Sequence, residues 1–271
     1  MPRAAVLGSP VAHSLSPVIH QAGYAAAGLV GWSYEAIECD KAGLADLVAG
    51  LGPEWAGLSL TMPLKEVALA VADEVADLPA VLGAANTLVR RGGGDWRAEN
   101  TDAPGVVDAV GDVRATAVTV LGAGGTARAA LGAAAQWSAG RVTVVARRAE
   151  AVEQLAPVAV ALGLDLVHRP WPEAAQALST ANLVVSTVPA GVADPLAGEV
   201  YWRPDAVLLD VLYHPWPTPL AASATAAGCR VVSGLELLLA QAVHQFRLFT
   251  GVPAPVAAMR DALRAAVAGP A

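Results

Sequence analysis

The chain has 271 residues, of which 55% are hydrophobic, so it holds enough apolar material for two domains with cores of their own. Its net charge of −7 and the lack of any basic run longer than a pair of residues argue against a nucleic-acid partner. No apolar run reaches the roughly eighteen residues of a membrane span, and the short apolar start does not fit a signal peptide, so we expect a cytoplasmic protein.

The first part of the chain alternates short apolar strands with amphipathic segments. Strands are predicted at 3–8, 32–38 and 55–60, with a helix from about Pro17 and another before the third strand. Two segments, 86–91 and 95–99, flank a glycine turn and predict a hairpin at the sheet edge. This rhythm indicates an α/β fold with a mostly parallel sheet.

The rhythm restarts near residue 115 and predicts a second α/β unit. Its expected strands are 117–121, 141–146, 165–167, 182–185, 206–210 and 230–232, and helices follow at 234–249 and 255–267. We therefore expect a substrate-binding domain over 1–103, a Rossmann-type NADP-binding domain over 104–235, and C-terminal helices 236–271 that pack back on the first domain. Gly234 then lies near the hinge.

A glycine-rich turn joins the first strand of the second unit to its helix. Residues 122–127 read G-A-G-G-T-A, which matches the dinucleotide fingerprint in its strand–turn–helix context. Glycines let the backbone approach a pyrophosphate, and the helix N-terminus supplies free N–H groups. The alternative is a merely tight turn. The predicted cofactor contacts from this loop are Gly122, Ala123, Gly124, Gly125 and Thr126.

The end of the next strand indicates which dinucleotide binds. Arg147 and Arg148 follow this strand directly, with no carboxylate before Glu150. An acidic residue there would accept the ribose hydroxyls of NAD, whereas arginine suits the 2′-phosphate of NADP. A solvated pair at a helix start is the alternative, but the helix dipole disfavours cations in that place. The sequence predicts NADP(H) as the cofactor.

Lysine is scarce in this chain, which has fifteen arginines and only two lysines, Lys41 and Lys65. Unlike arginine, lysine can release and take up a proton when its surroundings allow, so Lys65 is a candidate proton-transfer group. The alternative is a solvated cation in the first turn of a helix, paired locally with Glu66 or Asp73.

Polar residues gather near the expected strand ends of the first domain. Thr61, Lys65, Asn86 and Asp102 each follow a strand or turn, and we expect them to converge in one crevice. Taken singly, Asn86 and Asp102 also fit turn or helix-cap roles.

The segment 13–17, H-S-L-S-P, places two hydroxyls at the start of a helix. Ser16 alone fits an ordinary N-cap followed by Pro17, but Ser14 and Ser16 together predict a small anion pocket suited to a carboxylate. Metal chemistry is not expected, because the histidines are scattered and the two cysteines, Cys39 and Cys229, are far apart and predicted to be reduced.

Seven motifs, taken in order, closely resemble those of the shikimate dehydrogenase family and cover nearly the whole chain. They are H-S-L-S-P at 13–17, L-T-M-P-L-K at 60–65, G-A-A-N-T-L at 83–88, N-T-D-A-P-G at 100–105, G-A-G-G-T-A-R at 122–128, D-V-L-Y at 210–213 and G-L-E-L-L-L-A-Q-A at 234–242. The resemblance implies reversible, NADPH-dependent reduction of 3-dehydroshikimate to shikimate, a step of chorismate and aromatic amino-acid biosynthesis.

The resemblance also implies a role for individual residues. Lys65 and Asp102 would flank the reacting carbon, with Lys65 as general acid or base, and Ser14 and Ser16 would hold the substrate carboxylate. The other implied substrate contacts are Thr61, Asn86, Tyr213 and Gln241. Implied cofactor contacts beyond the glycine loop are Arg147, Arg148, Thr187, Val211 and Gly234.

Two departures from the family pattern bear on the cofactor. The family commonly has N-R-T where this chain has Ala146, Arg147 and Arg148, which keeps the central arginine and leaves the strength of the NADP preference open. The N-A-T-type segment near the nicotinamide reads S-T-V-P-A at 186–190, and only Thr187 is a conservative match.

Three alternatives stay open on this evidence. A quinate/shikimate dehydrogenase using NAD is disfavoured by the two arginines, and a folate-linked dehydrogenase of similar architecture would not need Ser14 and Ser16. A non-catalytic sensor that binds NADP(H) is disfavoured by the presence of both Lys65 and Asp102. The sequence leaves monomer and homodimer equally open.

Overall fold

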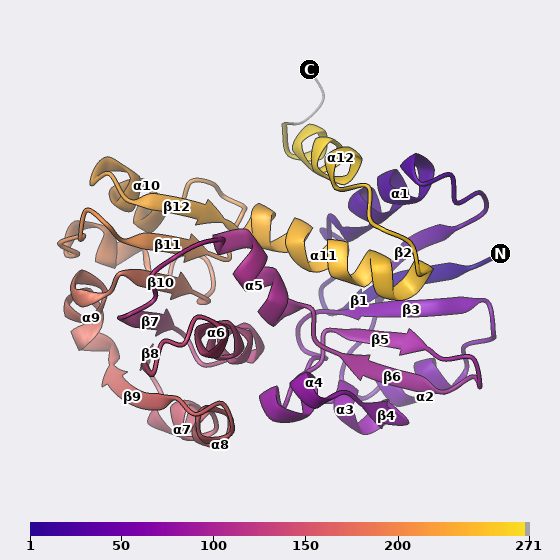
Figure 1. Ribbon diagram of the computed structural model, residues 1–271, viewed down its shortest axis with the longest axis horizontal. Coiled ribbons are helices and arrows are strands. Elements are labelled where there is room, and N and C mark those ends of the chain that lie inside the picture. Colours follow the sequence, from indigo (N-terminus) through magenta and orange to yellow (C-terminus); the bar gives the residue numbers. More distant parts are fainter. Residues whose placement is uncertain (269–271) are drawn as a thin grey trace. The chain divides into compact units, whose positions relative to one another are not determined.

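The computed structural model describes residues 1–268, and the chain divides into two compact units (Figure 1). Unit 1 comprises Met1–Gly105 together with the stretch that starts at Leu238, and unit 2 comprises Val106–Leu237. Both connections are helices, because α5 (Asp102–Val110) starts in unit 1 and ends in unit 2, and α11 (Gly234–Thr250) runs the other way.

Unit 1 is built on a six-stranded mixed sheet in the order β2-β1-β3-β5-β6-β4. The bounds of its strands are β1 Arg3–Gly8, β2 Ser33–Glu38, β3 Trp55–Leu60, β4 Glu74–Val75, β5 Thr87–Arg90 and β6 Trp96–Glu99. Strand β1 pairs in parallel with β2 and β3, whereas β5 is antiparallel to both β3 and β6.

The predicted hairpin forms as β5 and β6, but it is not the sheet edge, since β4 pairs in parallel with β6 outside it. This strand has only two residues, and flanking backbone hydrogen bonds from Asp73 to Trp96 and from Ala76 to Ala98 extend the pairing. A two-residue strand carries no readable alternation, so the sequence pattern did not reveal it.

Helices cover both faces of the unit 1 sheet. Helices α2 (Leu44–Ala49) and α3 (Ala68–Val71) supply side chains to a core that includes Leu7, Leu58 and Leu88 from the strands. From α11, Phe249 packs so closely on Gly57 of β3 that a Cβ there would lie 2.0 Å from its ring. Helix α12 (Val256–Ala268) packs along α1 (Ser16–Ala26), and α4 (Asp77–Leu82) precedes β5.

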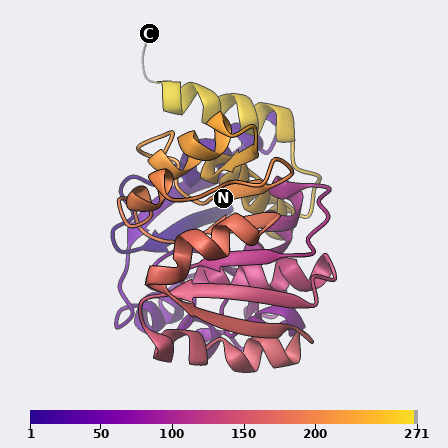
Figure 2. The same ribbon diagram turned by 90° about the vertical axis from the view of Figure 1, so that its left-hand side faces the viewer.

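Unit 2 is built on a six-stranded, wholly parallel sheet in the order β12-β11-β10-β7-β8-β9. Figure 2 shows the ribbon turned so that this unit faces the viewer. Its strands are β7 Val118–Leu121, β8 Arg141–Ala146, β9 Asp165–Pro170, β10 Leu183–Ser186, β11 Val207–Asp210 and β12 Arg230–Ser233. Its helices are α6 Gly125–Gln136, α7 Ala149–Glu153, α8 Ala156–Ala161, α9 Ala174–Thr180 and α10 Pro219–Ala226, with the 3₁₀ turns η1 Trp171–Glu173 and η2 Asp194–Gly198.

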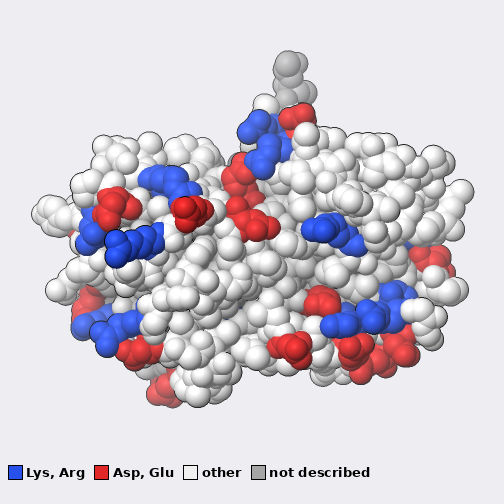
Figure 3. Space-filling model, in the orientation of Figure 1, with Lys and Arg blue, Asp and Glu red and all other residues white. Residues whose placement is uncertain are grey.

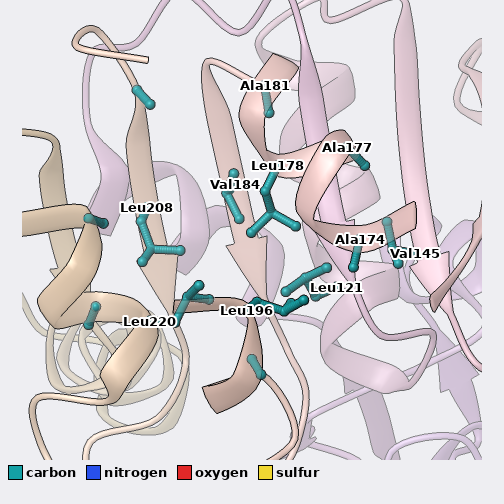
Figure 4. Packing of buried hydrophobic residues seen from close by; sticks show 14 of the residues in the cluster. Leu121, Val145, Ala174, Ala177, Leu178, Ala181, Val184, Leu196, Leu208 and Leu220 are labelled. Carbon is teal, nitrogen blue, oxygen red and sulfur yellow. The ribbon is translucent and has the colours of Figure 1, made fainter. Parts of the chain in front are cut away.

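One face of this sheet carries an apolar core, drawn in Figure 4. Leu121, Val184 and Leu208 from three strands meet Leu178 of α9 and Leu220 of α10, and all five are fully buried. Small alanines on α9 and α10 let these helices approach the strands closely. The two-domain α/β fold with a Rossmann-type half, expected from the alternation of strands and helices, is confirmed.

Charged residues make up 15% of the chain. On the face drawn in Figure 3, acidic and basic groups are interspersed among a majority of uncharged residues. Within residues 1–268, no helix is both long and apolar enough to cross a membrane.

Candidate active site

Strand directions in unit 1 bring four chain segments to one edge of the sheet. The parallel strands β1 and β3 end there, and β5 starts there because it runs antiparallel to β3. Strand β6 runs antiparallel to β5 and again ends there, with Glu99 opposite Thr87. Leu60 donates its backbone N–H to the Asn86 carbonyl at 2.7 Å, which fixes this edge. The segments that follow β3 and β6 and precede β5 therefore meet.

Lys65 and Asp102 form an ion pair at this edge. The Nζ atom of Lys65 lies 2.6 Å from Oδ2 of Asp102, and the two side chains are 17% and 8% exposed. Lys65 lies in the turn before α3 and does not pair with Asp73, whose carboxylate accepts instead from the Trp96 N–H at 2.8 Å. The two charges are thus largely removed from solvent, so water screens their Coulomb attraction less than it screens that of an exposed pair.

Asn86 holds the other oxygen of the Asp102 carboxylate. Its Nδ2 donates to Oδ1 of Asp102 at 2.8 Å, while its Oδ1 accepts from the Thr101 N–H at 2.7 Å. A carboxylate only accepts and a backbone N–H only donates, so these partners fix which way the amide faces. Nδ2 also lies 3.3 Å from Oε1 of Gln241 on α11. One carboxylate, one ammonium and two amides thus converge.

Asn100, rather than Asp102, caps the helix α5. The Oδ1 atom of Asn100 accepts from the Ala103 N–H at 3.1 Å, and its Nδ2 donates to the Ala84 carbonyl at 2.9 Å. This leaves the Asp102 carboxylate at the start of α5 free of the capping role and turned to Lys65. Sequence reasoning missed Asn100, although the N-T-D order places an Asn three residues before Ala103, which is cap spacing.

Gln241 packs against α5 at Gly105. A Cβ on Gly105 would lie 3.1 Å from the Gln241 backbone nitrogen and 3.1 Å from its Cβ, so a larger residue would push α11 away. Gln241 also donates to the Leu238 carbonyl at 3.0 Å, which braces its side chain against its own helix. Its placement beside Asn86 therefore depends on the close contact of two helix segments.

The two serines lie together at the start of α1. Ser14 Oγ accepts from the Ser16 N–H at 3.3 Å, and Ser16 is buried while Ser14 is half-buried. The helix starts at Ser16 itself and its cap position is Leu15, without a side-chain bond, so the alternative of an ordinary N-cap at Ser16 does not hold. Ser14 satisfies one of the first N–H groups in its place.

Thr61 follows β3 and packs against the end of β1. A Cβ on Gly8 would lie 2.3 Å from Thr61 Cγ2, so the first strand must end in glycine for this threonine to fit. The Thr61 N–H donates to the Leu7 carbonyl at 2.9 Å, and its carbonyl accepts from Leu64 at 2.8 Å. These bonds fix the start of the turn that carries Lys65.

In unit 2 the glycine loop lies between β7 and α6. Gly122 has a φ of +100°, and a Cβ there would lie 2.5 Å from Thr187 Oγ1, so only glycine fits. Gly124 is extended at the N-cap of α6, and a Cβ on it would meet nothing within 4 Å. Open space above free helix N–H groups is the cradle that a pyrophosphate needs, so these residues fit a dinucleotide.

Thr187, Val211 and Gly234 lie at the ends of neighbouring strands of the same unit. Thr187 Oγ1 donates to the Leu121 carbonyl at 2.7 Å, which ties the end of β10 to that of β7. Gly234 fits against β11 so tightly that a Cβ would lie 2.0 Å from the Val211 carbonyl oxygen. The backbone of these segments therefore forms one closely packed edge beside the glycine loop.

Arg147 and Arg148 directly follow β8, and both are exposed. Within the described residues 1–268, neither forms a salt bridge, unlike Arg141 at the start of the same strand, which pairs with Asp165 at 2.6 Å. Their guanidinium groups are thus open to an external anion. Ala123, in the glycine loop after β7, and Gly125 and Thr126, in the first turn of α6, are partly exposed.

Tyr213, in unit 2, follows β11 and is partly buried, which raises the pKa of its phenol and keeps the hydroxyl protonated as a donor. Its role as a substrate contact stays a prediction. No group of three His, Cys, Asp or Glu side chains that could hold a metal ion is found among residues 1–268.

Comparison with known proteins points in one direction. Residues 6–88 match a family model described as the shikimate dehydrogenase substrate binding domain, and residues 234–264 match the shikimate 5'-dehydrogenase C-terminal domain. The NADP(+)-dependent shikimate dehydrogenase of Caulobacter vibrioides is 40% identical over 266 residues, which cover 92% of this chain and 90% of the relative.

Solved structures agree. The shikimate dehydrogenase of Mycobacterium tuberculosis superposes with a TM-score of 0.91 at 47% identity, covering 97% of this chain and 99% of that one. The shikimate 5-dehydrogenase of Thermus thermophilus, solved in complex with NADP(H) and shikimate, gives a TM-score of 0.84 at 33% identity, covering 97% and 99%.

Proposed function

This chain belongs to the shikimate dehydrogenase family, and on that premise we propose how its own residues carry out the family's reaction, the reversible NADPH-dependent reduction of 3-dehydroshikimate to shikimate. The observation that carries the proposal is the partly buried pair of Lys65 and Asp102, held by Asn86 at one edge of the unit 1 sheet.

Lys65 is the general acid of the reduction. NADPH, when bound, supplies the hydride that the ketone carbon receives. As the ketone oxygen gains negative charge, the Lys65 ammonium stabilises it and then transfers a proton to it, giving the alcohol. Because the Lys65 side chain is still 17% exposed, solvent can restore its proton. In the oxidative direction the neutral amine accepts the proton.

Asp102 keeps the lysine in place before reaction. Oδ2 of Asp102 accepts from Lys65 and Oδ1 accepts from Asn86, so the carboxylate cannot rotate without breaking a bond. Such a fixed charge needs no reorganisation during the reaction, and that is the usual source of electrostatic catalysis.

The two ends of the substrate are proposed to meet different groups. Ser14 and Ser16 supply hydroxyls at a helix start for the carboxylate, where the free N–H groups also favour a negative charge. Thr61, Asn86, Gln241 and Tyr213 are proposed to hold the ring hydroxyls. We further propose that Arg147 and Arg148 hold the 2′-phosphate of NADP, because arginine forms bidentate bonds to phosphate.

The proposal is tested by shikimate-dependent NADPH formation, followed by absorbance. Lys65→Arg is the informative variant, because arginine keeps the positive charge beside Asp102 but does not release a proton. We expect kcat to fall by about a hundred- to ten-thousand-fold in Lys65→Arg and in Lys65→Ala. The control is Lys41→Ala, which removes the other, exposed lysine and should leave kcat unchanged. Full activity of Lys65→Arg would rule out proton transfer by this residue.

Cofactor choice is tested with NADP+ and NAD+ side by side. Arg147→Ala and Arg148→Ala should each raise KM for NADP+ by about tenfold or more, since each removes a charge-assisted hydrogen bond, and should change KM for NAD+ little. Arg141→Ala, at the other end of the same strand, is the control. Faster wild-type turnover of quinate with NAD+ would favour the quinate dehydrogenase alternative, and no turnover of either substrate would favour a sensor.

A further inference from the structure

Gln245 of α11 lies in the interior of unit 1, where it is 1% exposed and bonds at both ends of its amide. Its Nε2 donates to the Thr87 hydroxyl at 3.0 Å and to the Asn86 carbonyl at 3.2 Å, while its Oε1 accepts from the Ser59 hydroxyl at 2.8 Å. A buried glutamine side chain with every polar atom bonded is costly to place and tightly held once placed.

The hydrogen bonds on either side of Gln245 all have the same donor-to-acceptor direction. The Tyr34 hydroxyl donates to Ser59 Oγ at 2.6 Å, so Ser59 must use its single hydrogen on Gln245. Gln245 in turn donates to Thr87, so the Thr87 hydroxyl uses its single hydrogen on Asn86 Oδ1 at 2.9 Å. The chain therefore runs from Tyr34 through Ser59, Gln245 and Thr87 to Asn86, with each member donating to the next.

Asn86 connects this chain of hydrogen bonds to the ion pair. Its Oδ1 accepts at one end and its Nδ2 donates to Asp102 at the other, which leaves Asp102 Oδ2 for Lys65. Hydrogen bonds aligned in one direction polarise one another, so each strengthens its neighbour in a medium of low dielectric constant. Tyr34, Ser59 and Thr87 are each less than 5% exposed, so water does not compete for these bonds.

We propose that Gln245 is a positioning residue for the reaction, which acts through Thr87 and Asn86 to hold the Asp102 carboxylate in register with Lys65. This inference rests on the proposed function only for its kinetic consequence. At the far end of the chain, burial raises the pKa of the Tyr34 phenol, so its hydroxyl keeps the hydrogen that it donates to Ser59.

The test compares variants that cut the chain with one that only weakens the core. Gln245→Met keeps the length of the side chain but neither donates nor accepts as an amide does, and Tyr34→Phe removes one hydroxyl while keeping the ring that stacks on His20. The control is Phe246→Leu, the next residue of α11, which is fully buried and outside the chain of bonds. Melting temperature and NADPH affinity are measured for all.

A positioning role predicts a fall of about tenfold in kcat for Gln245→Met with KM for shikimate nearly unchanged, since a misplaced acid–base pair slows the chemical step. Phe246→Leu should keep its kcat even if its melting temperature falls as far. Tyr34→Phe should lower kcat less, and adding it to Gln245→Met should lower kcat no further, because the chain is already cut. Wild-type kcat in Gln245→Met would refute the inference.

A crystal structure of Gln245→Met gives a readout that does not depend on turnover. The inference predicts that the Asn86 amide turns or shifts and that its bond to Asp102 lengthens, whereas the same atoms stay in place in Phe246→Leu. An unmoved Asn86 and Asp102 in Gln245→Met would refute the positioning role. If the wild type fails to oxidise shikimate but this shift is seen, the proposed function fails and the positioning role stands.

Discussion

His20 should make unit 1 less stable in mild acid, because its ring is buried without a hydrogen-bond partner. It is fully buried on α1, stacks on Tyr34 with ring centroids 4.2 Å apart, and lies among Tyr24, Phe246 and Phe249. Within residues 1–268, neither of its ring nitrogens has a hydrogen-bond partner. Burial lowers the pKa of His20 from 6.5 to about 3, and the nearby Gln245 amide opposes this only in part.

The sign of the effect follows from these two pKa values. The folded state binds the proton less well than the unfolded state, so the contribution to stability is complete above 6.5 and is lost as the pH falls toward 3. At about pH 5 the unfolded histidine is nearly all protonated and the folded one is not. The free energy of unfolding is then lower by about 2 kcal/mol than near neutrality.

His20→Phe should remove this dependence, since phenylalanine keeps the stacked ring and has no proton to bind. Near neutral pH we expect the variant to be more stable by about 1–3 kcal/mol, because two buried nitrogens without partners are removed. At about pH 5 the advantage should grow by about 2 kcal/mol.

Urea unfolding of both proteins at the two pH values measures this difference, with His168→Gln as the control because His168 is exposed on β9. If wild type and His20→Phe lose the same stability on acidification, His20 is protonated in the folded state and the reasoning fails. A variant that is less stable at both pH values would show that packing outweighs the unpaired nitrogens.

Two further changes test single close contacts. Gly234→Ala should lower the stability of unit 2 by about 3 kcal/mol and weaken NADPH binding, since its Cβ would lie 2.0 Å from the Val211 carbonyl oxygen. Thermal unfolding and fluorescence titration measure both, and Gly198→Ala, which meets nothing within 4 Å, should change neither. Asn100→Ala should cost about 1–2 kcal/mol through the lost cap of α5 and lower kcat by moving Asp102, measured by urea unfolding and steady-state kinetics. A stable variant with full kcat would contradict the capping role.

The alternation of apolar strands and helical segments determined the fold class, seven short motifs in order determined the family resemblance, and both are confirmed. These features are local, since a strand or helix reveals its period within a few residues. The glycine turn after β7 and the arginine pair after β8 could be identified in the sequence as candidate cofactor contacts, because that prediction depends only on the strand that precedes each of them. The roles of these residues in binding NADP stay predictions.

The partners of each polar side chain were decided by the tertiary structure. Lys65 could pair with Glu66, Asp73 or a distant carboxylate as far as the sequence shows, and strand register places it beside Asp102, 37 residues away. Thr87, Asn100 and Gln245 were not singled out, because buried polar residues show no signal until their neighbours are known. Gln245 meets Asn86 across 159 residues through the packing of α11 on the sheet. The sequence by itself thus determined which groups are available for catalysis. The antiparallel direction of β5 and the return of α11 to unit 1 decided which of these groups touch, because hydrogen bonds act over only about 3 Å.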